Sequence, residues 1–180
     1  MKARFIGMTA ILLPLVCITM MAQKVTVDFD KATTFTNFKT YTWKQGTPAK
    51  SPLMDQRVLG AIDKQLALKG LKKVDAESAP DLVVIYHAAV EYETQLNTID
   101  MGGWNGWYGP YYGGGTSTTT VDKIPVGQLR VDIGDVKQRK LIWQGRATDT
   151  LSDKPEKVEK TINKASEKMF KDFPPKEKKK

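Results

Sequence analysis

The chain has 180 residues, with 28 Lys and Arg against 20 Asp and Glu, and it contains one Cys and one His. A single Cys cannot form an internal disulfide bond, and one Cys with one His cannot supply the four ligands of a closed zinc site. We therefore expect no metal ion and no cofactor. The length predicts one domain, large enough to bury roughly 70% of the surface of its unfolded chain.

The first 22 residues have the composition of a secretory signal peptide. Lys2 and Arg4 precede an apolar run over residues 5–21, and Ala22 supplies a small residue at the cleavage point. This pattern predicts an exported protein that is periplasmic, envelope-associated or secreted. A retained membrane anchor is the alternative, but Pro14 interrupts the run and no basic cluster follows it directly.

Cys17 raises the separate question of a lipid anchor. Bacterial lipoproteins carry a lipidated Cys at the end of the apolar region, usually preceded by Leu, a small residue, and then Gly, Ala or Ser. Here bulky Val16 stands directly before Cys17, which is a poor match, so cleavage after Ala22 is expected and lipidation is the alternative. After that cleavage the mature chain has no cysteine, which suits an oxidising compartment.

The first half of the mature chain reads as two strands and a helix. Residues 25–30 alternate apolar and polar side chains, and residues 40–43 are β-branched or aromatic, so both predict strands. A helix then begins at Pro52 with Ser51 as its cap, and Gly70 ends it. One apolar stripe is formed by Val58, Leu59, Ile62 and Leu66.

The second half is rich in strands. Residues 71–74 predict a short strand, and residues 81–94 predict the longest one, buried on both sides at its beginning and solvated on one side at its end. Three more strands are expected over residues 116–121, 127–135 and 140–150. The inward faces of the last two are marked by Leu129, Val131 and Ile133, and by Leu141, Trp143, Gly145 and Ala147.

A second helix follows, and the element order then defines the fold class. Asp153 can cap this helix with Glu156 completing a capping box, and the run at residues 173–175, Phe-Pro-Pro, ends it. The order strand, strand, helix, strands, helix predicts a single α+β domain over residues 23–175, with an antiparallel or mixed sheet and two helices packed on one face. Residues 176–180 are expected to be a disordered basic tail.

His87 is the candidate for acid–base chemistry, because it alone titrates near neutrality without perturbation. The sequence contains no Gly-x-Ser-x-Gly elbow and no His-Glu-x-x-His pair to accompany it. A strand histidine satisfied by a backbone or side-chain partner is the simpler interpretation. Paired carboxylates could act without it, at Asp28 and Asp30, Glu91 and Glu93, or Asp132 and Asp135, although such spacing also occurs on solvated sheet faces.

A glycine-rich aromatic segment over residues 101–115 is the best candidate for a binding element. It contains seven glycines, one proline and five aromatic residues, Trp104, Trp107, Tyr108, Tyr111 and Tyr112. Such rings can stack on sugars, peptides or a partner surface, because they provide large contact area at low entropic cost. The alternative is that the loop folds back and covers an open side of the sheet. It is not a phosphate loop, since no Gly-x-x-x-x-Gly-Lys-[Ser/Thr] motif is present.

The positive charge does not indicate a nucleic-acid-binding protein. Four lysines lie in the last five residues, and the second helix alternates Lys and Glu, which is typical of a solvated face. Peripheral attraction to an anionic envelope surface is compatible with this charge.

Several segments together resemble the DUF4136 family of bacterial envelope proteins, over residues 24–175. They are residues 25–43 with their Asp-Phe-Asp and Tyr-x-Trp landmarks, residues 80–87 with Asp-Leu and Tyr-His, the Gly/Trp/Tyr loop, the strands beginning at Gly127 and Lys140, and the final Phe-Pro-Pro. The resemblance implies an exported protein, often a lipoprotein, without an assigned reaction or catalytic residues. Val16–Cys17 departs from the lipoprotein pattern.

Three functional hypotheses follow. The first is a non-enzymatic envelope or periplasmic binding or accessory module that contacts an envelope protein or glycan through the residues 104–112. The second is a hydrolase that uses carboxylates near His87, which requires an acid within hydrogen-bond reach of that ring. The third is a purely structural envelope component with an inward-packed aromatic loop.

Overall fold

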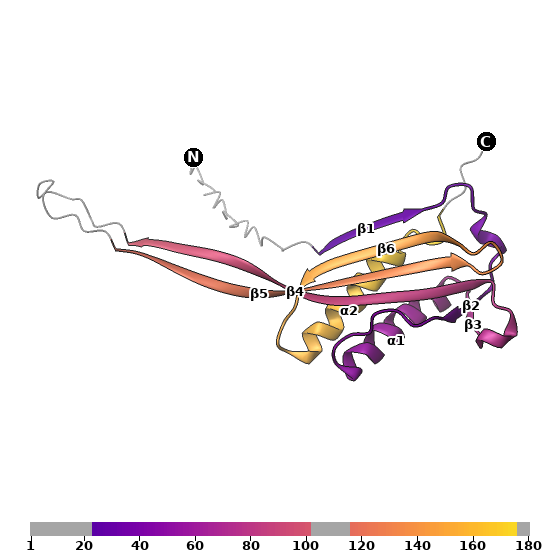
Figure 1. Ribbon diagram of the computed structural model, residues 1–180, viewed down its shortest axis with the longest axis horizontal. Helices are drawn as coiled ribbons and strands as arrows, with labels where there is room; N and C mark the ends of the chain where they lie inside the picture. The colour runs from indigo at the N-terminus through magenta and orange to yellow at the C-terminus, as the bar shows by residue number, and fades with distance from the viewer. Residues whose placement is uncertain (1–22, 102–115, 176–180) are drawn as a thin grey trace, which may run out of the picture.

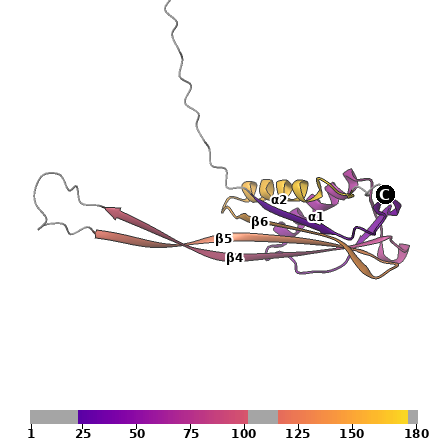
Figure 2. The same ribbon diagram turned by 90° about the horizontal axis from the view of Figure 1, so that it is seen from above.

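The computed structural model describes residues 23–101 and 116–175, which form one six-stranded mixed sheet with both helices on one of its faces (Figures 1 and 2). The predicted α+β class and element order are confirmed. The strands are β1 (Lys24–Phe29), β2 (Thr40–Trp43), β3 (Lys72–Lys73), β4 (Leu82–Met101), β5 (Thr116–Asp135) and β6 (Lys140–Thr150), and the helices are α1 (Pro52–Leu68) and α2 (Pro155–Phe170).

The strand order across the sheet is β1-β6-β5-β4-β2-β3. The pairs β1–β6, β5–β6 and β4–β5 are antiparallel, and β2 lies parallel to both β3 and β4. The chain returns from β2 to β4 through α1, which is the crossover that a parallel pair requires. Figure 2 shows the two helices as a layer above the sheet, and no helix of the described residues covers the opposite face, which we call the open face.

The helices lie where the apolar spacing places them, but their caps differ from the prediction. Neither Ser51 nor the residue before α2 makes a side-chain capping bond, and α2 begins at Pro155 rather than at Asp153. The capping-box prediction for Asp153 and Glu156 is therefore wrong. Both helices instead begin with Pro, whose fixed φ and missing N–H suit a first helical position.

The core lies between the helix layer and the sheet. Ile62 and Leu66 of α1 are fully buried against β4 and β5, where Val84 and Ile133 are equally inaccessible. Trp143 of β6 stacks on Phe170 of α2, with ring centroids 4.9 Å apart. Burial of each such side chain stabilises the fold by roughly 1.5–3 kcal/mol, so this layer supplies most of the driving force for folding.

Two strand predictions are corrected by the structure. Residues 116–121 and 127–135 belong to one continuous strand, β5, which contains Pro125. Proline is tolerated there because β6 pairs with β5 only from Val126, and the carbonyl of Pro125 still accepts the N–H of Leu151.

The second correction concerns Leu141, which was expected to face inward. The register of β5 and β6 shifts between Ile133 and Gly134, because Trp143 pairs with Ile133 and Leu141 pairs with Gly134. The extra residue, Ile142, is buried, and Leu141 is 52% exposed. A β-bulge of this kind turns one side chain to the other face.

The predictions for residues 1–22 and 176–180, including Cys17, lie outside the described residues. Within the part of the chain that the structure describes, no helix is long and apolar enough to cross a membrane.

Candidate functional site

The most prominent feature is a two-stranded arm that projects from the sheet. We define the arm as residues 91–101 of β4 paired with residues 116–126 of β5. β6 pairs with β5 only up to Val126, and β2 pairs with β4 only as far as Val84, so neither neighbour reaches along the arm. Figure 1 shows the pair of strands extending far beyond the helices and the other strands.

One face of the arm is uncovered and carries large apolar side chains, with the pair Thr94 and Lys123 between them. The side chains of Tyr92, Leu96 and Val121 are 64%, 66% and 57% exposed, and Leu96 pairs directly with Val121 while Tyr92 pairs with Pro125. Since alternate residues share a face, this is the face that carries buried core residues such as Val84 further along β4. The core face of the sheet therefore continues onto the arm, where the helices no longer cover it.

The other face of the arm is polar. It carries Glu91, Glu93 and Gln95 from β4, and Asn97 there donates a hydrogen bond of 3.1 Å to Asp122 of β5. The partners of the two glutamates on β5 are apolar, Val126 and Ile124. The arm thus exposes large apolar side chains on one face and two glutamates on the other. A two-stranded ribbon alone is marginally stable in water, and a contiguous exposed apolar surface usually marks a site of interaction.

The aromatic residues predicted as a binding element fall in the segment that joins the two strands of the arm. Trp104, Trp107, Tyr108, Tyr111 and Tyr112 lie outside the described residues. Their exposure, which separates the binding hypothesis from the structural one, stays a prediction.

His87 lies on the open face of the sheet and is half-buried. Its Nδ1 accepts a hydrogen bond from the backbone N–H of Thr47 at 3.2 Å, and the Thr47 hydroxyl oxygen lies 2.9 Å from the same nitrogen. The chain reaches this position because Gly46 passes so close to the Tyr86 carbonyl that a Cβ atom would overlap it. The expectation of a strand histidine with a backbone or side-chain partner is confirmed.

An acid lies beside His87, but it is engaged elsewhere. The nearest oxygen of Asp132 is 3.7 Å from His87 Nε2, which is beyond hydrogen-bond distance. That carboxylate accepts a 2.8 Å hydrogen bond from Gln144 and forms an ion pair with Arg130 at 3.2 Å. The hydrolase hypothesis requires a hydrogen bond between His87 and an acid, and the structure places an acid nearby but without that bond.

The three carboxylate pairs named from the sequence do not converge on one site. Asp30 binds Lys140 at 2.7 Å and accepts bonds from the Ala32 N–H and the Thr33 hydroxyl, which lower its pKa to about 2. Asp135 is buried and accepts the N–H of Gln138 in the turn after β5. The remaining acids are one exposed residue on β1, two on the polar face of the arm, and the engaged Asp132.

A polar junction centred on Asp63 of α1 was not anticipated from the sequence. Its Oδ1 accepts hydrogen bonds from the Tyr41 hydroxyl at 2.7 Å and from Trp43 Nε1 at 2.8 Å, and its Oδ2 binds Lys73 at 3.1 Å. Burial, together with the bond to Asp63, raises the pKa of Tyr41. The Tyr-x-Trp spacing could have indicated this junction, because residues two apart on a strand lie on the same face of the sheet and can share one partner.

Asp81 plays a similar structural role at the start of β4. Its Oδ2 accepts the N–H groups of Lys39 and Thr40 and the Thr40 hydroxyl, at 2.8, 2.9 and 3.0 Å. The backbone donors lower the pKa of this carboxyl group. Asp81 thereby aligns the beginning of β2 with β4.

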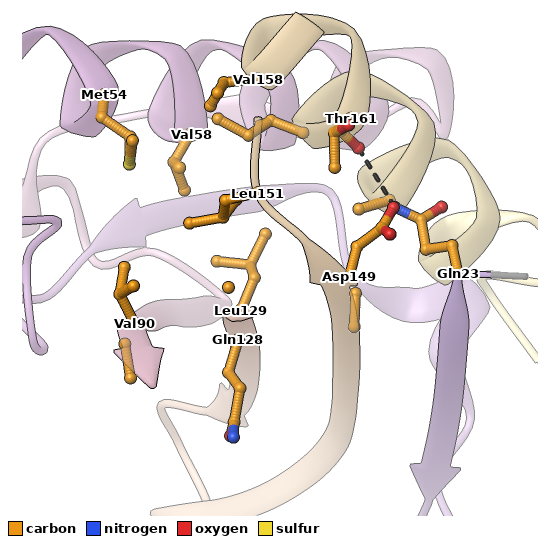
Figure 3. Close-up of a pocket in the computed structure, with 15 residues that line it drawn as sticks. Gln23, Met54, Val58, Val90, Gln128, Leu129, Asp149, Leu151, Val158 and Thr161 are labelled. Carbon is orange, nitrogen blue, oxygen red and sulfur yellow. Dashed lines mark hydrogen bonds between the residues drawn. The ribbon is translucent and has the colours of Figure 1, made fainter. Parts of the chain in front are cut away.

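A small apolar cavity lies between the starts of both helices and the base of the arm (Figure 3). Its volume is about 60 Å³, and Met54, Val58, Leu151 and Val158 line it. Gln23 at its edge donates a 3.2 Å hydrogen bond to the carbonyl of Thr161, drawn as the dashed line in Figure 3. Because a cavity that holds benzene measures roughly 150 Å³, this one is a packing gap rather than a ligand site.

The described residues contain no cluster of side chains suited to bind a metal ion. No group of three or more His, Cys, Asp and Glu side chains is arranged to hold a metal ion there.

The fold and the arm together define the class of this protein, an α+β domain with a mixed sheet, one helix layer and a projecting hairpin. The model of the DUF4136 family, described as a domain of unknown function, matches residues 25–175. The chain therefore belongs to the DUF4136 family, as its sequence motifs indicated. No curated protein matches the chain.

Solved structures share the fold at low sequence identity. A DUF4136 family protein from Bacteroides thetaiotaomicron is 13% identical with a TM-score of 0.51, over 84% of this chain and 96% of that one. The PelC dodecamer from Paraburkholderia phytofirmans is 13% identical with a TM-score of 0.51, over 83% and 95%. A PDZ domain protein from Parabacteroides distasonis is 18% identical with a TM-score of 0.53, and the match covers 86% of this chain but only 35% of that one.

Proposed function

We propose that this chain is an exported, non-enzymatic binding module of the bacterial envelope, and that it assembles with further copies of itself through the arm. The observation that carries the proposal is the set of exposed apolar side chains on one face of the arm, Tyr92, Leu96 and Val121 beside Pro125, which no described element covers. Export is supported by the basic and apolar composition of residues 1–22.

A second copy is the partner to which we commit. The PelC structure, which has a similar fold over nearly its whole length, is a dodecamer by its description. An arm that leaves the body of one subunit and packs on the body of the next is a head-to-tail contact, and such contacts close into rings when the rotation between subunits allows it. Capture of a different envelope protein is the other outcome of the test.

The test measures the mass of the mature chain in solution by light scattering coupled to size-exclusion chromatography. The wild-type protein should form an oligomer, and Leu96→Thr with Val121→Thr should shift it to the monomer, because the variant removes apolar area while keeping good strand formers. Gln95→Thr with Asn97→Thr on the polar face of the same arm is the matched control and should leave the oligomer intact. A monomeric wild-type protein, or an oligomer that survives the apolar-face variant, would contradict self-assembly through this surface.

The aromatic residues at positions 104–112 are a separate candidate contact, for an envelope protein or a glycan, and the sequence alone supports it. If residues 104–112 bind an envelope protein or glycan, replacing Trp104, Trp107, Tyr111 and Tyr112 with Ala should abolish partner capture in a cross-linking pull-down. The circular dichroism spectrum and melting temperature should stay unchanged. An unchanged set of cross-linked partners would remove the loop from the binding surface and favour the purely structural role.

The cellular location of the protein and its attachment to lipid are tested separately. Fractionation of cells that express the wild-type chain or Cys17→Ala, with labelling by a radioactive fatty acid, distinguishes cleavage after Ala22 from lipid attachment at Cys17. We expect an unlabelled protein in the periplasmic fraction for both chains. Label that depends on Cys17 would establish the lipid-anchored alternative.

A further inference from the structure

Two arginines and the only histidine form a row across the open face of the sheet. In the registers of β4, β5 and β6, His87 pairs with Arg130, and Arg130 pairs with Arg146. Their sequence neighbours Tyr86, Val131 and Gly145 are buried on the helix side, so the side chains of His87, Arg130 and Arg146 lie on the opposite face.

Two arginines directly opposite each other are unfavourable in a sheet, because the Cβ atoms of such a pair are only about 5 Å apart. Asp132 relieves this for one of them, with its Oδ2 3.2 Å from Arg130 Nε. Arg130 Nε is nevertheless buried without a hydrogen-bond partner, and no described carboxylate lies within ion-pair distance of Arg146, which is exposed. The fold thus retains a charge arrangement that costs stability and is only partly neutralised.

The two flanks of this row differ in charge. On one flank the next row holds Asp132 and Gln144, followed by Asp28 on β1. On the other flank the next row holds Gln128, Thr148 and Lys24, which pair across β5, β6 and β1. An anion is therefore repelled from the first flank and attracted to the second, where Arg130, Arg146 and Lys24 surround neutral hydrogen-bonding groups.

We propose that this surface binds the oxyanion groups of an acidic glycan, with Arg146 and Arg130 as the principal ligands. The planar guanidinium group donates two parallel hydrogen bonds to a carboxylate. Thr26 of β1 pairs with Arg146, and its hydroxyl group, with that of Thr148 and the amide of Gln128, suits the hydroxyl groups of a sugar. This site lies on the body of the protein and does not depend on the arm.

Two other anionic partners fit this surface less well. The large apolar side chains that are exposed in the described chain lie elsewhere, so these rows offer nothing to insert into a bilayer. The only aromatic ring in these rows is that of His87, which is half-buried and hydrogen-bonded to Thr47, so the rows offer little surface on which a nucleic-acid base could stack. A flat polar surface with paired guanidinium groups is best matched by a sugar chain with carboxylates.

The test measures binding of the mature full-length protein to oligogalacturonate by calorimetry at low salt, with neutral dextran of equal length as the comparison. Oligogalacturonate should bind and dextran should not, and Arg146→Gln should weaken binding by about tenfold, since it removes one bidentate contact. Arg146→Lys keeps the charge but cannot donate two parallel hydrogen bonds, so its affinity should lie between those of Arg146→Gln and the wild-type protein. Lys157→Gln with Lys160→Gln on α2 changes the net charge more and should leave binding unchanged.

Several outcomes would overturn the proposal. One is equal binding by the wild-type protein and Arg146→Gln, and another is an equal loss in the α2 control, which would reduce the effect to net charge. Competition by millimolar inorganic phosphate supports an oxyanion site, whereas Arg146-dependent binding to phosphatidylglycerol vesicles without binding to oligogalacturonate would replace the glycan with a lipid headgroup. Arg146→Gln should fold at least as stably as the wild-type protein, because it relieves the repulsion from Arg130.

Discussion

Gly145 of β6 lies directly against Met169 of α2, and a Cβ atom at Gly145 would overlap the Met169 side chain and the Trp143 ring. Helix α2 is thereby seated on the sheet at a distance that only glycine permits. The Trp143–Phe170 stack closes the same region, so the helix layer depends on this contact.

Gly145→Ala should destabilise the protein by about 1–3 kcal/mol, because a methyl group inserted into a packed core forces Met169 and Trp143 out of place. The matched control is Gly60→Ala in α1, where a Cβ atom would meet nothing within 4 Å. That change should stabilise the protein by about 0.5–1 kcal/mol, since alanine favours the helix. Urea unfolding followed by circular dichroism measures both, and a neutral Gly145→Ala would show that the helix layer can shift.

Asp63→Ala should cost about 2–3 kcal/mol, because Tyr41 and Trp43 then lose the carboxylate that accepts their hydrogen bonds. Lys73→Gln removes only the half-exposed ion pair with the same Asp63 and should cost less than about 1 kcal/mol. Equal effects of the two changes in chemical unfolding would show that the ion pair, rather than the aromatic donors, makes the junction stable.

Alkaline pH should weaken the same junction. The pKa of Tyr41 is raised in the folded protein, so its stabilising contribution is fully present below the usual tyrosine pKa of about 10 and is lost as the pH rises through that region. The free energy of unfolding, measured from pH 8 to pH 11, should therefore fall above about pH 10. The free energy of unfolding of Tyr41→Phe should fall less steeply over this range. An identical slope for the two proteins would contradict the role of Tyr41 in the alkaline loss of stability.

Acid should act through Asp30 and Asp81. Both carboxyl groups have a lowered pKa in the folded protein, that of Asp30 to about 2, so their contribution is present above the usual aspartate pKa of about 4 and is lost as the pH falls below about 4 toward the folded pKa. Asp81→Asn should reduce stability at pH 7 and flatten its decline between pH 5 and pH 3. Glu93→Gln, an exposed acid on the arm, is the control and should keep the wild-type decline.

His87 should carry its proton on Nε2 when it is neutral. Nδ1 accepts the Thr47 N–H, and a nitrogen that accepts a hydrogen bond holds no proton. Because His87 is the only histidine of the chain, nitrogen NMR shifts report this tautomer without assignment. Gly46→Ala should shift the signal, since the added Cβ atom displaces the segment that carries Thr47. A proton found on Nδ1 of the wild-type protein would contradict the geometry.

The sequence by itself determined the class and order of the elements, because apolar spacing is a local property. The stripe of Val58, Ile62 and Leu66 predicted α1, and the alternation around Val84 and Val131 predicted the central strands. The family motifs likewise lie in short, contiguous segments. The predicted capping bonds of Ser51 and Asp153 were wrong because serine and aspartate are also common in loops. Whether such a side chain caps a helix depends on local backbone angles, which composition does not report.

Only the tertiary structure decided how these elements combine into surfaces. The register that sets Arg130 opposite Arg146 arises from pairing between strands, and a one-residue shift would turn those side chains to the other face. The bulge that exposes Leu141 and the junction at Asp63 depend on partners far apart in the chain. The arm emerges for the same reason: β4 and β5 continue as strands where β2 and β6 have ended, and no local pattern reports where a neighbouring strand stops.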